Sequence, residues 1–287
     1  MVKKIYISSD KRVSGDESDF QWQMPFSERL AQETEVIIDG VSITNVFYTV
    51  DSHNCNLYWG ERNTSVTPNT RVGFKSVIPS GNYTPQTLGV AIQNLMNARS
   101  QAFGYKNVYS VVYSDFTNTY TITKTNNTTT PSPLVADFTF WSNAELKQQS
   151  AVWAAASVDP IAGFHPLSAY KLIGLPRDGT RTDATTHALP NAVNLIPHQC
   201  LYLHSSNMGD IGSSIGPGGE QTILRRIPVT AGFGEVIHSE ISNVADTINM
   251  SGFQLSNLHF RLCDEEARTV NLRGVGFSFS FLVIDRD

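Results

Sequence analysis

The sequence predicts an all-β protein, a single jelly-roll β-sandwich with an inserted helix-and-hairpin region. Apolar and polar residues alternate in segments spread along the chain, which is typical of strands with one buried and one wetter face. The turns between these segments are rich in Gly, Asn and Pro, and only one segment has a strong helical periodicity. Long irregular loops separate the strands, which favours a jelly roll over a regular up-and-down barrel.

The alternation is clearest in the C-terminal segment 257–287. Apolar residues occupy every second position from 258 to 262, and a polar cluster follows at 264–268. Beside the glycines of 274–276, the apolar residues change from even-numbered to odd-numbered positions. Such a change is typical of a bulge or a bend. We therefore expect a hairpin whose long second strand runs to the C-terminus and fills the space between two sheets. Its core side chains are Phe277, Phe279, Phe281 and Val283.

One helix interrupts the strand-like segments. Thr84 can serve as its N-cap and Pro85 as its first residue, and both are favourable at those positions. We expect the apolar stripe of this helix to pack on a sheet, and we expect a second short helix at 143–156. The stripe consists of Leu88, Ala91, Ile92, Leu95 and Met96. The strand-like segments are 35–50, 55–62, 70–78, 109–125, 199–206, 222–230 and 235–241.

The length of the chain suits one large domain or two modest ones. No linker of uniform composition divides it. We expect an N-terminal arm at 1–34 and a jelly-roll domain at 35–287, with 80–190 as a candidate inserted sub-domain.

Charge and composition narrow the functional classes. The net charge of −5 excludes a nucleic-acid binder that acts through bulk positive charge. Nucleic-acid contact is expected at most through the N-terminal arm, which carries Lys3, Lys4, Lys11 and Arg12. No apolar run approaches the ~20 residues of a transmembrane helix, so we expect no membrane insertion, and the first residues do not resemble a signal peptide. The three cysteines lie far apart, which argues against a disulfide framework and favours a reducing compartment.

No motif pairs a nucleophile with a base, so we expect neither an enzyme nor a cofactor. The seven histidines form none of the common zinc spacings. A metal-binding jelly roll of the cupin type is an alternative, although the two-His-plus-Glu cluster of that family is absent. The glycine-rich stretch 216–219 lacks the Lys-Ser/Thr of a phosphate-binding loop. We interpret the acidic stretch 263–268 as a solvated hairpin turn, with calcium binding as the alternative.

Several motifs, taken in order, resemble those of single jelly-roll capsid proteins from icosahedral double-stranded DNA viruses. They are similar to the penton proteins of virophages, polinton-like viruses and adintoviruses, and to related minor capsid proteins of giant viruses. Roughly 126–168 and 177–198 lie outside the resemblance. Ala267 stands where glycine is common in these proteins, and Phe277 where tryptophan is common. The segments that carry the resemblance are ISSDKRVSGDESDFQWQMP near the start, VIIDGVSITNVFYTVDSHNCNLYW (36–59), IPSGNYTPQTLGVAIQNLMN (78–97), YKLIGLP (170–176), CLYLHSS (200–206), ILRRIPVTAGFGEVIH (223–238) and LSNLHFRLCDEEARTVNLRGVGFSFSFLV (255–283).

The resemblance implies a penton, the capsid protein of a fivefold vertex, with the C-terminal strand central in a sheet. The expected partners are further copies of the chain in a homopentamer, the major capsid protein and other minor capsid proteins. The expected location is the virion, after assembly inside the host cell. A fivefold ring is a head-to-tail interface that closes. Candidate inter-subunit contacts lie in 10–26 and 207–221 and include Phe20, Trp22 and Phe26.

Two alternatives stay open within the structural classes. The chain could be another minor capsid protein of the same shell. It could also be a receptor- or carbohydrate-binding β-sandwich, such as a fibre head. That alternative predicts a trimer or a monomer with exposed Tyr or Trp side chains for sugar stacking.

Overall fold

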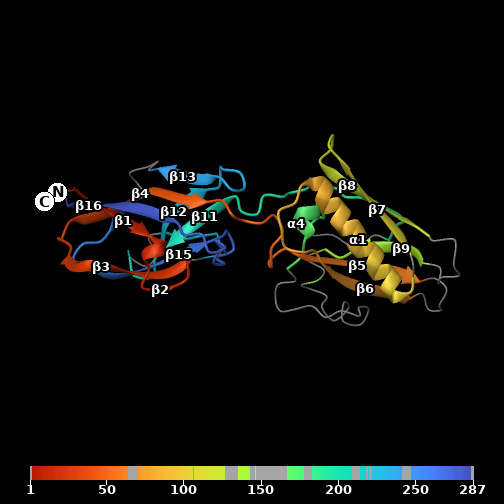
Figure 1. The fold of residues 1–287 in the computed structure, drawn as a ribbon, viewed down its shortest axis with the longest axis horizontal. Helices are drawn as coiled ribbons and strands as arrows, with labels where there is room; N and C mark the ends of the chain where they lie inside the picture. The colour runs from red at the N-terminus through yellow and green to blue at the C-terminus, as the bar shows by residue number, and fades with distance from the viewer. Residues whose placement is uncertain are drawn as a thin grey trace. The chain divides into compact units, whose positions relative to one another are not determined.

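The chain divides into two compact units (Figure 1). The sandwich unit comprises Met1–Phe47 and His198–Asp287, and the insert unit comprises Tyr48–Pro197. The sub-domain expected at 80–190 lies within the insert unit, which begins and ends outside those bounds because the strands before residue 80 pair inside it. The computed structural model describes residues 2–63, 70–105, 107–126, 135–142, 146, 167–177, 183–208, 214–217, 219, 222–240 and 247–285.

The sandwich unit consists of two antiparallel sheets. One has the strand order β1-β16-β4-β13, with β14 also paired to β4, and the other has the order β12-β11-β15-β3-β2. The short 3-10 helix η1 (Ser9–Lys11) follows β1. The strands are β1 (Val2–Ser8), β2 (Ser14–Gly15), β3 (Asp19–Arg29), β4 (Thr34–Thr44), β11 (Cys200–His204), β12 (Ile223–Pro228), β13 (Val236–Glu240), β14 (Ile248–Asn249), β15 (Gln254–Cys263) and β16 (Ser278–Asp285).

The strand order of this unit is that of a jelly roll. Apart from the two-residue strands β2 and β14, the described residues of the unit form eight strands. Numbered in chain order, they are arranged 1-8-3-6 in one sheet and 2-7-4-5 in the other. Two sheets of four antiparallel strands linked in this way form the double Greek key of the jelly roll. In the sequence, the insert unit comes between the third and the fourth of these strands, β4 and β11. The predicted fold class is therefore confirmed.

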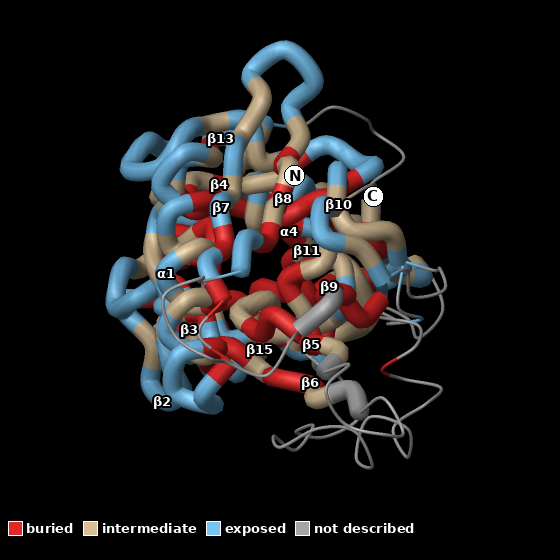
Figure 2. The backbone as a smooth tube through the Cα atoms, turned by 90° about the vertical axis from the view of Figure 1, so that its right-hand side faces the viewer, coloured by how far each residue is buried: buried red, intermediate tan, exposed pale blue. Residues whose placement is uncertain are grey.

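The core of the sandwich unit lies between its two sheets. Phe277, Phe279, Phe281 and Val283 are all buried, with at most 4% of each residue exposed. The Phe279 ring lies 4.8 Å from the Phe260 ring of β15 in the opposite sheet, centroid to centroid. Burying each such ring contributes about 1.5–3 kcal/mol. Figure 2 shows the same distribution along the chain, with buried positions on the strands and exposed turns around them.

The expected C-terminal hairpin is wrong. β15 pairs with β11 and β3, whereas β16 pairs with β1 and β4, so the two strands belong to different sheets. At 274–276, where the apolar residues change from even to odd positions, the chain crosses from one sheet to the other. It does not form a bulge inside a strand. Gly276 lets the side chain of Asp10 approach the backbone at this crossing, because a Cβ there would collide with it.

The expected N-terminal arm at 1–34 is also replaced by strands. β1 pairs with β16 along its whole length, and β3 pairs with β15. The physical reason is that both segments bury apolar side chains at alternate positions, among them Ile7, Phe20 and Met24. The first residues are therefore part of the sandwich.

The described part of the insert unit combines two three-stranded sheets with one long helix. The sheet orders are β6-β5-β9 and β10-β8-β7. The second short helix that the sequence predicts at 143–156 lies outside the described residues, of which only Leu146 falls in that range. The elements of the unit are β5 (Asn56–Asn63), β6 (Thr70–Val77), α1 (Pro85–Phe103), β7 (Val108–Ser114), β8 (Thr119–Thr125), β9 (Val135–Phe140), α4 (Tyr170–Ile173) and β10 (Thr186–Ala188).

Helix α1 confirms the sequence prediction. Thr84 is its N-cap, with the side chain accepting a hydrogen bond from the Thr87 N–H at 3.2 Å, and Pro85 is the first helical residue. The stripe is buried at Leu88, Ile92 and Met96, and it packs against residues of both sheets. The helix ends at Gly104, whose positive φ is one that glycine adopts readily.

Polar residues of α1 also protect the free edge of β7. Asn97 accepts a hydrogen bond from the Tyr109 N–H at 2.6 Å and donates to the Tyr109 carbonyl at 3.3 Å. Gln93 accepts from the Val111 N–H at 3.1 Å. These bonds satisfy backbone groups that an edge strand would otherwise offer to another chain.

Among the described residues, no helix is both long and apolar enough to span a membrane.

Candidate functional site

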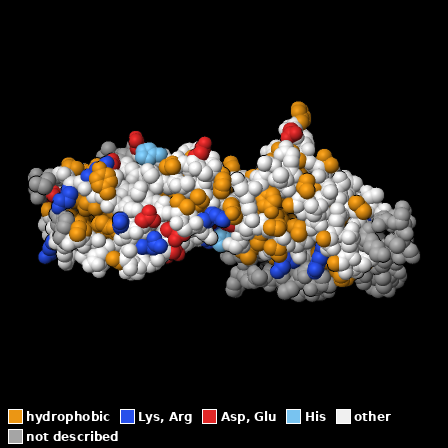
Figure 3. Space-filling view, viewed as in Figure 1, with side chains coloured by type: hydrophobic (Ala, Val, Ile, Leu, Met, Phe, Trp, Pro, Cys, Tyr) orange, Lys and Arg blue, Asp and Glu red, His pale blue; other side chains and the backbone are white. Residues whose placement is uncertain are grey.

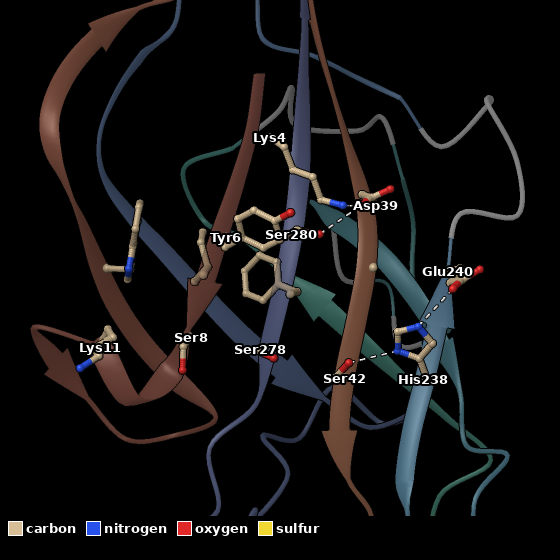
Figure 4. A pocket seen from close by; sticks show the side chains of 14 residues that line it. Lys4, Tyr6, Ser8, Lys11, Asp39, Ser42, His238, Glu240, Ser278 and Ser280 are labelled. Atoms are coloured by element: carbon tan, nitrogen blue, oxygen red, sulfur yellow. Dashed lines mark hydrogen bonds and ion pairs between the residues drawn. The ribbon is translucent and has the colours of Figure 1, made fainter. Parts of the chain in front are cut away.

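A groove lies over the outer face of the β1-β16-β4-β13 sheet (Figure 4) and extends to the core residues Ile7 and Phe279 and to Trp22 on β3 of the other sheet. It encloses about 960 Å³. The inward-pointing residues of these strands fill the core, so the groove is built mainly from residues of the opposite parity. We call it the serine groove, because its floor is formed by Ser8, Gly40, Ser42, Ser278 and Ser280.

Strand register brings these residues together. Directly opposed side chains on one face of an antiparallel pair lie about 5 Å apart. The short side chains of β16 and β4 form the floor, and larger side chains on β1 and β13 form two walls. One row across the sheet holds Ser8, Ser278, Ser42 and His238, and the next holds Tyr6, Ser280, Gly40 and Glu240.

A fixed ion pair lies at one end of the groove. The register between β4 and β16 skips Asp39, which is the extra residue of a β-bulge. The Asp39 carboxylate accepts hydrogen bonds from Lys4 Nζ and from Ser280 Oγ, the latter at 3.1 Å. The bond from Lys4 lowers the pKa of Asp39, and the same bond raises the pKa of Lys4. Both groups are therefore charged over a wide pH range.

His238 connects the groove floor to the opposite wall. Its Nδ1 lies 3.1 Å from Ser42 Oγ, and its Nε2 lies 3.3 Å from Glu240 Oε1. A hydroxyl, an imidazole and a carboxylate in this order also make up a catalytic triad, in which they are the nucleophile, the general base and the group that orients the base. However, β4 is paired on both sides, so its amide groups are used within the sheet and are not free to stabilise an oxyanion. The arrangement suits the binding of a ligand through hydrogen bonds.

The candidate inter-subunit contacts have different surroundings. Phe20 is 1% exposed and packs against Phe260 and Phe277, so it is a core residue and is not available for contact between subunits. Its position on β3 places it on the inward face. Trp22 is partly buried against the same core and also lines the serine groove. The side chain of Phe26 lies outside the described residues, as does part of 207–221.

The part of the chain that the structure describes holds no group of three or more His, Cys, Asp or Glu side chains placed to bind a metal. His259 makes a local contact instead, with its Nε2 2.7 Å from Asp19 Oδ1 and its Nδ1 2.9 Å from Ser206 Oγ. His165 lies outside the described residues. The free cysteines are Cys55, Cys200 and Cys263.

The acidic stretch 263–268 forms a turn held by its own side chains. Asp264 Oδ1 accepts hydrogen bonds from the N–H groups of Glu266 and Arg268, both at 2.9 Å, and Oδ2 accepts from Arg268 Nε at 2.8 Å. Burial alone would raise the pKa of Asp264, but the hydrogen bonds from Arg268 and its charge lower it overall. These contacts favour a self-contained turn over a calcium site.

The insert unit contains a buried carboxylate, Glu61 on β5, which is 0% exposed. Its Oε1 accepts hydrogen bonds from Ser100 at 2.9 Å, from Asn107 at 2.8 Å and from the Tyr109 hydroxyl. Among the described residues, its Oε2 has no hydrogen-bond partner. Burial raises the pKa of Glu61, and burial also raises the pKa of Tyr109 well above its usual range. The cluster ties α1 and β7 to β5.

The turn between β7 and β8 carries exposed apolar surface. Phe116 is 98% exposed, and Val112 on the adjoining strand is 59% exposed. In Figure 3, hydrophobic atoms are visible at the tip of this hairpin beside an acidic side chain. Apolar side chains exposed singly are common on protein surfaces, so Phe116 by itself does not identify a contact surface.

The sequence contained part of the signal for the serine groove. Ser278 and Ser280 alternate with the core phenylalanines of β16, and Lys4, Tyr6 and Ser8 alternate in the same way on β1. Alternation therefore predicts which side chains point outward. It does not predict which strands lie side by side, so the convergence of these residues with His238 and Glu240 was missed.

No protein-family model matches the sequence, and no curated protein matches it. Among solved structures, the chain is similar to the crystal structure of the mavirus penton protein, with 12% sequence identity and a TM-score of 0.47. The comparison covers 99% of this chain and 98% of that chain. Both the identity and the TM-score are low, so this likeness carries no argument about function.

Proposed function

We propose that the chain is a structural capsid protein that forms the penton, the fivefold vertex, of an icosahedral double-stranded DNA virus. The observation that carries the proposal is the strand order of the sandwich unit, 1-8-3-6 facing 2-7-4-5. This is the jelly roll, an architecture that viral capsid proteins use widely.

Topology alone does not decide between functions, because lectins and cupins share the architecture. The ordered motifs supply the second support. They include 36–59 and 255–283, which provide β4 and β16, the two central strands of one sheet. They also include 78–97, which provides most of α1 in the insert unit. Support therefore comes from both units of the chain.

As a penton, the chain would assemble into a homopentamer in the virion and contact the major capsid protein and other minor capsid proteins. A fivefold ring requires two different surfaces on each subunit that fit one another. The exposed tip at Phe116 is a candidate for one of them, because burying an apolar ring against a neighbour is favourable. Lys4, one of the four basic residues near the N-terminus, lies on a strand and is paired with Asp39.

Negative-stain electron microscopy of the purified chain tests the proposal. We expect closed rings whose class averages have fivefold symmetry. Phe116→Ser is expected to weaken the rings while leaving the fold intact, because the side chain is 98% exposed in the single chain. Averages with threefold symmetry would contradict the vertex role.

The second candidate is a receptor- or carbohydrate-binding β-sandwich such as a fibre head. One observation favours it: the serine groove carries an exposed aromatic ring, Tyr6, which is 72% exposed beside a polar floor. A trimer or a monomer in the same images would support this candidate over the penton.

A further inference from the structure

We propose that the serine groove binds a neutral oligosaccharide. The inference concerns one face of the sandwich unit and does not depend on the capsid role. It rests on the shape of the groove, on the hydrogen-bonding groups that line it, on the balance of its charges and on one exposed aromatic ring.

The shape of the groove suits a flat, extended ligand. Its volume of about 960 Å³ is at the upper end of the range for small-molecule sites. The floor is shallow because β16 and β4 present only serines and a glycine there, whereas Tyr6 and His238 rise on either side. A sugar ring can lie on such a floor while its edges contact the walls, whose side chains Tyr6 and His238 are labelled in Figure 4.

The lining offers hydrogen-bond donors and acceptors in close mixture. Each serine hydroxyl can donate one hydrogen bond and accept two, while a carboxylate only accepts and an ammonium only donates. Asp39 and Glu240 supply the acceptors, and Lys4 supplies the donors. A sugar hydroxyl also donates and accepts, so it is satisfied by a mixed lining, whereas a phosphate or sulfate requires donors throughout.

The charges of the lining balance. Lys4 and Lys11 face Asp39 and Glu240, so the lining has no formal net charge when His238 is neutral. The charge of Lys4 is further offset by its ion pair with Asp39. A site for a polyanion would have an excess of basic side chains, and a site for a cation would have an excess of acidic ones. The balance therefore favours an uncharged ligand.

Tyr6 provides an apolar face beside this polar floor. Its ring is 72% exposed, and Lys4 Nζ lies 5.3 Å from the ring centroid. An aromatic ring combines a large apolar face with a polar end, so it can bury the C–H face of a sugar while the hydroxyls reach the floor. Polar edges together with an apolar face are the recognition features of a pyranose.

The structure offers a variant that fills the groove without disturbing the fold. A Cβ added at Gly40 would have only Ser280 Oγ within contact range, at 4.0 Å, and Gly40 does not have a positive φ. Gly40→Val therefore places methyl groups over the floor, and valine is favourable in a strand. Tyr6→Ala removes the apolar face and is a second, independent variant.

The experiment screens the full chain against an array of neutral, sialylated and sulfated oligosaccharides, followed by solution titration with the tightest neutral binder. We expect binding to neutral oligosaccharides. Relative to the unmodified chain, affinity should fall roughly tenfold or more in Gly40→Val and roughly tenfold in Tyr6→Ala. Val90→Ala, at an exposed position of α1 in the insert unit, is the control and should bind unchanged. Circular dichroism and thermal melting establish that all variants are folded.

Three results would overturn the proposal. The first is the absence of binding to any oligosaccharide on the array, and the second is a preference for sialylated or sulfated ligands. The third is undiminished binding by folded Gly40→Val, which would place the ligand elsewhere on the chain. The penton proposal is tested separately, by oligomeric state.

Discussion

Ala267 has a backbone conformation that most residues avoid. Its φ is +60°, and it lies in the turn after β15, where the capsid proteins that the chain resembles often have glycine. A left-handed conformation costs a non-glycine residue roughly 1–2 kcal/mol, and glycine loses part of this advantage through its greater freedom in the unfolded chain. We expect Ala267→Gly to raise the free energy of unfolding of the sandwich unit by about 0.5–1 kcal/mol, measured by urea denaturation.

The matched control is Ala98→Gly, at an exposed position in α1. There the backbone is right-handed, so the same change should lower the free energy of unfolding by about 1 kcal/mol. The two substitutions should therefore have opposite signs. A loss of stability in Ala267→Gly would show that the turn does not strain this residue.

Phe279 shows how strongly one strand face determines the fold. The side chain is 4% exposed between the two sheets. Phe279→Asp removes about 1.5–3 kcal/mol of apolar burial and adds the larger cost of an unpaired buried charge. We expect this variant to yield no soluble, folded sandwich unit, as judged by circular dichroism and thermal melting.

Ser278→Asp is the control for Phe279→Asp, because the neighbouring residue points outward and is exposed. It should change the free energy of unfolding by less than about 1 kcal/mol, since an outward aspartate stays in water. If Phe279→Asp remained folded with an unchanged melting temperature, the core position of β16 would be refuted.

Among the elements, α1 was predictable because its determinants are local. Thr84, Pro85 and the apolar stripe all lie within one segment, and each acts within one or two helical turns. The C-terminal strands are the opposite case. Alternation gave the inward faces of β15 and β16 correctly, but their partners, β3, β11, β1 and β4, come from distant parts of the chain. A hairpin was therefore expected where the chain crosses between sheets.

The cluster around Glu61 makes the insert unit sensitive to pH. Burial raises the folded-state pKa of Glu61 above its ordinary value of 4.5, so the folded state binds the proton more tightly than the unfolded state. The contribution of Glu61 to stability is therefore full below pH 4.5 and is lost as the pH rises through the folded-state pKa. Across that window the free energy of unfolding should fall by up to about 1.4 kcal/mol per pH unit.

Glu61→Gln removes this titration while keeping an oxygen to accept hydrogen bonds from Ser100, Asn107 and Tyr109. We expect the stability of the variant to depend less on pH between 4.5 and 7 than that of the unmodified chain, by urea denaturation at several pH values. The slope is the relevant quantity, because the new amide nitrogen takes the place of Oε2, which has no partner in the described part of the chain. Equal slopes in the two proteins would contradict a raised pKa.

For the whole molecule, the decisive features are pairings between distant segments. β1 and β16 lie at the two ends of the chain and pair from Val2 with Ile284 to Ser8 with Ser278. No local pattern specifies such a pairing, which is why the first residues were expected to form an arm. The serine groove has the same origin, since its floor and its two walls come from β1, β16, β4 and β13, which only the complete sheet brings together.

The central claim is that the chain closes into a fivefold ring, and the solution mass of the purified protein tests it most directly. Native mass spectrometry or light scattering over a range of concentrations would provide the measurement. We predict one discrete species at five times the 31.7 kDa mass of the chain. A stable trimer, or a monomer at every concentration, would contradict the claim.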